Sequence, residues 1–187
     1  MISLDWKERL KKDTIDFAER KLPASNFDID IIYNAYPQRI DNKIPHAVIT
    51  LVGKTLGALI YKEADKYFTF YNYLLKEKGE NGKMIFAYVM ARVIRKNPDN
   101  FLGYIENILL TTEDQKFCNL LLDKAIFPMI KKDPVKHLDL LANWIKKDNE
   151  HLTLSLQKMI IKLIGFQPKL VKPIFQKLET AWLYATP

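Results

Sequence analysis

The chain has 187 residues, 48% of them apolar and 27% charged, which is enough to bury one hydrophobic core. The single cysteine, Cys118, excludes an intramolecular disulfide and a cysteine-based zinc site, and it favours a reducing, cytoplasmic location. The longest apolar stretch, AVITLVGKTLGALIY, is interrupted by Lys54, so we expect no membrane-spanning segment and no membrane partner. Only 6 glycines occur, which favours long helices over a turn-rich β-fold.

The first 44 residues are predicted to form an N-terminal helical cap. Trp6, Leu10 and Phe17 have the spacing of one helix face, which predicts a helix over about residues 3–20. LPASN then breaks the pattern. A shorter helical segment is expected near residues 27–36, followed by a loop over 37–45.

A doubled phrase, IKKDP at 130–134 and IKKDN at 145–149, predicts how the later helices are joined. Lysines suit the last turn of a helix, aspartate is a preferred N-cap, and proline fits the first helical position. Each phrase therefore indicates that one helix ends and another begins almost at once. The helix between the two phrases is predicted to bury Val135, Leu138, Leu141 and Ile145 along one face.

The same junction recurs at a nearly fixed period. Prolines stand at 98, 134 and 168, with spacings of 36 and 34, and a further step of 34 back reaches Ala64. Apolar segments of helical period precede the junctions, near residues 47–62, 83–95, 115–131 and 151–165. A period of this length is typical of stacked helix pairs. We therefore predict an all-α fold, a right-handed α-solenoid of HEAT-like helix pairs. It would be a single domain over 1–187, with about four pairs over 45–187.

The stretch LVGKTLG at 51–57 contains Gly-Lys-Thr, as phosphate-binding loops do. Such a loop needs another glycine where this chain has Val48, and the surrounding pattern is helical. Gly53 and Gly57 are therefore predicted to permit close packing of helices rather than to bind a nucleotide.

The net charge of +7 is concentrated towards the C-terminus, where residues 114–187 hold 12 lysines against 7 acidic residues. This excess favours a polyanionic partner, although solubility alone is an alternative explanation. Lys169 and Lys172 stand near the start of the final helix, where the helix dipole does not favour them. The candidate DNA-binding residues are Lys132, Lys136, Lys146, Lys147, Lys158, Lys162, Lys169 and Lys172.

The stretch HLDLLANW at 137–144, with the following IKKDNEHLTLSLQKMI, resembles the HEAT-like repeat proteins of the DNA alkylation-repair family. The resemblance covers about residues 45–187. It implies an α-solenoid with a basic concave face that acts as a glycosylase on N-alkylated purines. This chain departs from the family pattern at Val135, where a tryptophan is usual, and at Leu154 and Ser155, where arginines are usual.

If the resemblance extends to chemistry, Asp139 is the catalytic carboxylate. An N-alkylated purine is already cationic and leaves without a general acid, so the enzyme needs only to stabilise positive charge on the sugar. Trp144 and Trp182 would be the aromatic residues that face the lesion. The three histidines are far apart in sequence, and neither a metal site nor a cofactor is expected.

Two functions stay open. The first is a protein that binds duplex DNA, with or without base-excision activity. The alternative is a non-catalytic helical-repeat scaffold that binds a protein or peptide. The sequence indicates no oligomeric state.

Overall fold

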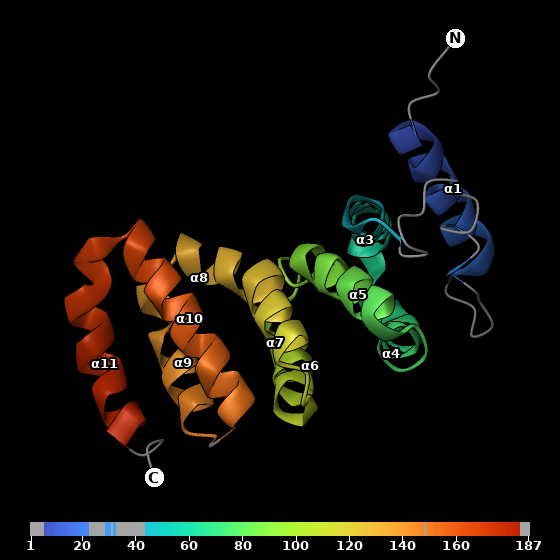
Figure 1. Cartoon of the computed structure of the whole chain (residues 1–187). Helices are drawn as coiled ribbons and strands as arrows, with labels where there is room; N and C mark the ends of the chain where they lie inside the picture. Colours follow the sequence, from blue (N-terminus) through green and yellow to red (C-terminus); the bar gives the residue numbers. More distant parts are fainter. Residues whose placement is uncertain (1–5, 23–28, 31, 33–43, 148, 184–187) are drawn as a thin grey trace. The chain divides into compact units, whose positions relative to one another are not determined.

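The structure is a computed structural model that describes residues 6–22, 29, 30, 32, 44–147 and 149–183, with the side chains of 180–183 excepted. The described residues form helices joined by short turns, without a β-strand, which confirms the all-α prediction (Figure 1). None of the described helices combines the length and apolar character needed to cross a bilayer. The segment predicted near 27–36 and the loop over 37–45 lie largely outside the described residues.

The chain folds as two compact units, Met1–Lys96 and Asn97–Pro187, which we call unit 1 and unit 2. Each unit is built from helices that present apolar residues to their neighbours inside the unit. The division falls at the junction KNPDN, where one helix ends and Pro98 begins the next. The single continuous domain expected from the sequence stays a prediction.

Unit 1 is organised around one central helix. Helix α3 (His46–Ile60) packs against both α1 (Trp6–Lys21) and α5 (Gly79–Val93). A 3-10 segment, η1 (Tyr61–Tyr67), leads into α4 (Phe68–Glu77), which also packs on α5. Gly53 and Gly57 let α3 approach α5 closely. A Cβ atom at Gly53 would lie 2.7 Å from the Cβ of Tyr88, so the predicted close packing is confirmed.

The helical elements of unit 2 fall into two sets. Members of the two sets alternate along the sequence. The first set consists of α6 (Pro98–Thr111), then η3 (Val135–His137) with α9 (Leu138–Ile145), then η4 (Pro168–Leu170) with α11 (Val171–Leu183). The second set consists of α7 (Gln115–Leu121), η2 (Leu122–Ile126) and α8 (Phe127–Lys132), then α10 (Glu150–Phe166). Helix α9 packs on α11, and α7 with η2 packs on α10 (Figure 1). Elements that occupy equivalent places in the predicted repeats therefore lie side by side.

Side-chain caps begin several helices, both at the predicted junction phrases and at Asp114, which belongs to none of them. The side-chain oxygens of Asp114 and Asn149 accept hydrogen bonds from the N–H groups of Phe117 (3.0 Å) and Leu152 (2.9 Å). Asp133 accepts a longer bond from the N–H of Lys136, at 3.5 Å. The prediction that one helix ends and another begins at each of these phrases is thereby confirmed. In IKKDN the capping residue is Asn149. Asp148 lies outside the described residues.

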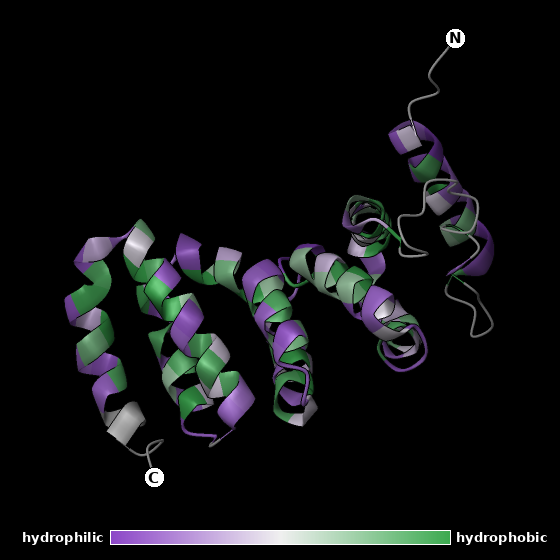
Figure 2. Cartoon of the chain, viewed as in Figure 1, coloured by the Kyte–Doolittle hydropathy of each residue, from purple (hydrophilic) through white to green (hydrophobic). Residues whose placement is uncertain are grey.

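The described helices carry alternating apolar and polar residues along their length, as amphipathic helices do (Figure 2). The predicted buried face of α9 is confirmed for Leu138, Leu141 and Ile145, which are at most 5% exposed. It is wrong for Val135, which is 62% exposed. The reason is local, because Val135 lies in the 3-10 turn η3, whose three residues per turn rotate it away from the face that α9 buries.

We expect Leu141→Ala to lower the free energy of unfolding by about 2–5 kcal/mol, because the side chain is fully buried and the change leaves a cavity. Val135→Ala is the matched control and should change it by less than about 0.5 kcal/mol. Chemical denaturation followed by circular dichroism measures both variants. A loss below about 1 kcal/mol for Leu141→Ala would contradict the observed packing of α9.

Candidate functional site

The elements α7, η2 and α8 follow one another without a break and form one helical rod of unit 2. A π-helical turn, η2, interrupts this rod. Pro128 lacks a backbone N–H, and its ring would clash with the carbonyl oxygen of Lys124 in a regular α-helix. The rod widens instead, and the N–H of Phe127 donates to the carbonyl of Leu122, five residues back. Leu122 at the start of the turn and Ile130 beyond it are both buried.

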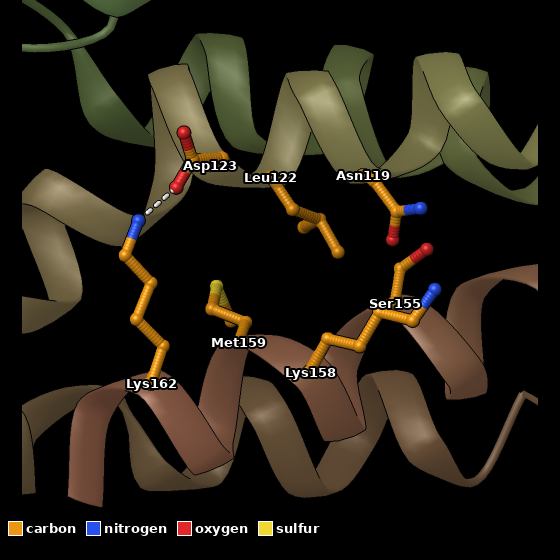
Figure 3. A pocket seen from close by; sticks show the side chains of 7 residues that line it. All are labelled: Asn119, Leu122, Asp123, Ser155, Lys158, Met159 and Lys162. Atoms are coloured by element: carbon orange, nitrogen blue, oxygen red, sulfur yellow. Dashed lines mark hydrogen bonds and ion pairs between the residues drawn. The ribbon is translucent and has the colours of Figure 1, made fainter. Parts of the chain in front are cut away.

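The π-turn lines a small pocket between this rod and α10, with a volume of about 160 Å³. Figure 3 shows the ion pair between Lys162 and Asp123 at one end of the pocket. The side chains of Ser155 and Lys158 lie at the other end, and apolar side chains separate the two ends. The full lining is Asn119, Leu122, Asp123, Ser155, Lys158, Met159 and Lys162.

Asp123 organises the charges at its end of the pocket. Its carboxylate accepts a hydrogen bond from Lys124 at 2.8 Å and another from Lys162 of α10. Partial burial acts to raise the pKa of Asp123, but the hydrogen bonds and charges of the two lysines outweigh it and hold that pKa below its ordinary value. Asp123 therefore stays ionised and ties the π-turn to α10.

A polar network fixes α7 against the start of α10. The Gln115 side chain donates to the His151 carbonyl at 3.0 Å and to the Ser155 hydroxyl at 2.5 Å. Cys118 is buried beside this network, as the sequence predicts for a small apolar residue. Burial raises the pKa of the Cys118 thiol, so the group is protonated at neutral pH and is not an activated nucleophile.

The two junctions that end α8 and α10 lie next to one another. The Gln167 side chain donates to the carbonyl of Lys131 at 3.3 Å, which joins the start of one junction to the start of the other. Five exposed lysines occur on these junctions and the helical turns beside them, and no ion pair of theirs is described. We call this cluster the basic junction end: Lys131, Lys132, Lys136, Lys169 and Lys172.

Aromatic rings lie within this basic surface. The ammonium group of Lys131 is 3.6 Å from the ring centroid of Phe166, a residue that is 54% exposed. The Phe166 ring contacts that of Phe127, with centroids 5.9 Å apart, and Lys162 lies 4.4 Å from the Phe127 centroid. The basic junction end therefore continues through the two rings to Lys162 at the pocket.

The predicted DNA-binding lysines fall into three places. Lys132, Lys136, Lys169 and Lys172 come together at the basic junction end, and Lys158 and Lys162 lie at the pocket on α10. Lys146 and Lys147 follow α9 and stand at the opposite end of the helix pair. There Lys147 is 3.5 Å from the carboxylate of Glu106. The structure thus places four of the eight lysines at the basic junction end, two at the pocket and two at the opposite end of α9.

The residues predicted to act in catalysis or to face a lesion do not line the pocket. Asp139 is on α9, its side chain is 74% exposed, and its carboxylate pairs with Lys177 of α11 at 2.5 Å. Trp144 is only 1% exposed, and its buried Nε1 has no hydrogen-bond partner among the described residues. That burial supports a packing role for Trp144 rather than contact with a lesion. The side chain of Trp182 lies outside the described residues.

Sequence reasoning missed four contributors to this surface, namely Asp123, Lys124, Lys131 and Phe166. A proline inside an apolar helical run is a signal for a helix distortion, and Pro128 could have marked the π-turn next to Asp123. The sequence contains no comparable signal for the contact between Lys131 and Phe166, because 35 residues separate them.

Comparisons of the chain with protein-family models, with curated proteins and with solved structures give no match.

We expect Asp123→Asn to unfold at a lower denaturant concentration than the wild type at pH 7, because the partly exposed ion pairs to Lys124 and Lys162 are lost. The difference should be at most about 1 kcal/mol. Since the pKa of Asp123 is lowered in the folded protein, its stabilisation is present above the ordinary carboxyl pKa and is lost as the pH falls through the lowered one. Denaturation at a series of pH values measures this.

The matched control is Asp65→Asn, which removes an exposed carboxylate of unit 1 for which no ion pair is described. A stability difference between wild type and Asp123→Asn that is the same at pH 3 and pH 7 would contradict the role given to the ion pairs.

Proposed function

We propose that this chain is a helical-repeat protein that binds duplex DNA through the basic junction end of unit 2. The observation that carries the proposal is the gathering of Lys131, Lys132, Lys136, Lys169 and Lys172, from two junctions that are distant in sequence, on one surface. Asp133 is the one acidic residue on those two junctions. Lysines so arranged attract phosphate groups and give sequence-independent affinity for a nucleic acid.

The α-solenoid is the architecture we propose for this role. The period of 34–36 residues and the packing of α9 on α11 and of α7 on α10 support it. Stacked pairs repeat their junctions along one edge, so lysines placed at successive junctions form a row. Such a row matches the regular spacing of phosphates along a duplex.

Base excision on alkylated DNA is a narrower proposal, and it depends on Asp139. Its exposed carboxylate would be accessible to a sugar, in support of the role that the resemblance implies. The ion pair with Lys177 neutralises part of the negative charge that such a role requires. Substrate binding would have to displace or share that lysine.

A protein-binding scaffold is the second candidate, and exposed apolar side chains on the last two helices favour it. On α10, Leu154 and Ile161 are 41% and 70% exposed. On α11, Val171 and Phe175 are 39% and 55% exposed. Exposed apolar side chains such as these favour a partner that covers them.

We expect the affinity for duplex DNA to fall steeply with salt, by about 0.9 in log K per unit of log salt for each phosphate neutralised. Replacing both Lys169 and Lys172 by alanine should flatten this slope by about 1–2 units. The matched control replaces Lys146 and Lys147, which removes the same charge from the opposite end of unit 2 and should leave the slope nearly unchanged. Fluorescence anisotropy of a labelled duplex at several salt concentrations measures both.

Equal slopes for the wild type and the Lys169/Lys172 double variant would remove these lysines from the binding surface. If the wild type shows no duplex binding at low salt, the scaffold is the better account.

For Asp139, we expect Asp139→Asn to reduce the release of methylated purines from alkylated duplex DNA by about 10²–10³-fold, because the charge that stabilises the cationic transition state is lost. Duplex affinity should not fall, since a negative charge near phosphates is removed. Single-turnover base release measures the rate. Lys177→Ala is the control, because it leaves the carboxylate and removes its partner. A wild type that releases no base, or one whose rate equals that of Asp139→Asn, would refute the enzymatic proposal.

A further inference from the structure

Unit 1 carries a basic groove of its own, where α3 and α5 meet. A Cβ atom at Gly57 would lie 3.1 Å from the Cβ of Arg92, and at Gly53 it would lie 2.7 Å from the Cβ of Tyr88. The two glycines therefore bring the backbone of α3 against the part of α5 that bears Tyr88 and Arg92. Lys54, which follows Gly53, is consequently on the same groove as these two residues.

The groove has a volume of about 390 Å³ and three cationic side chains, those of Lys54, Arg92 and Arg95. The described lining contains no carboxylate, and no ion pair is described for any of the three cations. The ammonium group of Lys54 is 5.8 Å from the ring centroid of Tyr88, and the Arg92 guanidinium is 5.8 Å from that of Tyr61. Three cations without an ion pair among the described residues, two of them beside aromatic rings, form a site for an anion that also has planar groups.

A second hollow of about 490 Å³ continues the groove towards α1. It shares Lys54 and Tyr88 with the first, and it adds Trp6, Lys7 and His46. Its described lining also lacks a carboxylate. The two hollows together form a path across α1, α3 and α5 with cations along it and an indole at one end.

We propose that this groove of unit 1 binds a short segment of single-stranded nucleic acid. Lys54, Arg92 and Arg95 would contact successive phosphates, and the Trp6 ring would stack on a base. Sites for single strands combine these two features, a cationic path for the backbone and aromatic faces for the bases. The helix dipole explains Arg92 in the last turn of α5, but it does not explain Lys54 in the middle of α3.

The proposal concerns a different unit and a different ligand from the duplex-binding proposal, so each can fail without the other. The probes are a labelled 20-nucleotide oligothymidine and a labelled duplex of equal length. We expect the wild type to bind the oligothymidine at low salt with quenching of its tryptophan fluorescence. Trp6→Phe should keep most of the affinity and lose most of the quenching. Trp6→Ala should weaken binding about 5- to 100-fold.

The double variant Arg92→Gln with Arg95→Gln should weaken oligothymidine binding at least about tenfold. It should also flatten the salt slope by about 1.4 units, at about 0.7 for each phosphate of a single strand. Its duplex affinity should equal that of the wild type. The matched control, Lys62→Gln with Lys76→Gln, removes the same charge from exposed positions of unit 1 outside the groove, and it should change neither affinity. Circular dichroism checks that all variants fold.

Three results would overturn the proposal. One is a wild type that does not bind the oligothymidine at low salt, and another is an equal loss of binding in the control variant. The third is a parallel loss of duplex and oligothymidine binding in the arginine variant, which would make the groove part of a duplex surface. Loss of single-strand binding with unchanged duplex binding supports it.

Discussion

The missing backbone N–H of Pro128 is the constraint on which the surface of unit 2 depends. Because this residue cannot donate to the carbonyl of Lys124, the rod from α7 to α8 widens into a π-turn. The widened turn places Asp123 where it pairs with Lys162 and keeps Ile130 in the core. Helix α8 begins directly after this turn, and its Lys131 contacts Phe166 at the basic junction end.

Ion pairs divide the lysines of unit 2 into those that hold the fold and those that face outwards. Lys162, Lys177 and Lys147 each bind a carboxylate on a neighbouring helix, so much of their charge is compensated locally. The junction lysines have no such partner among the described residues. A chain with a positive excess can thus use some cations for packing helix on helix and leave others for an anionic ligand.

The sequence predicted those features that depend on residues close together in the chain, such as helix ends and the buried face of a regular helix. The proline at 98 that begins α6 and the phrases IKKDP and IKKDN mark helix ends within a few residues, so these junctions could be located by inspection. Leu141 was identified as core because α9 is regular, whereas Val135 was misplaced because its 3-10 turn has another period. The pairing of Asp139 with Lys177 could not be predicted, since it depends on how α9 lies against α11.

The π-turn also affects which residues of one predicted helix pair correspond to which residues of the next. The rod from α7 to α8 contains 18 residues, and α10, its counterpart in the next pair, contains 17. The prolines that begin these pairs are 36 and 34 residues from the next one, a difference of two, and one of those two residues lies in the rod. One additional residue is accommodated by widening a turn rather than by lengthening the helix. The rod and α10 can therefore match in helical turns but not in residues, and aligning these two helices requires a gap of one residue, which we place within 122–126.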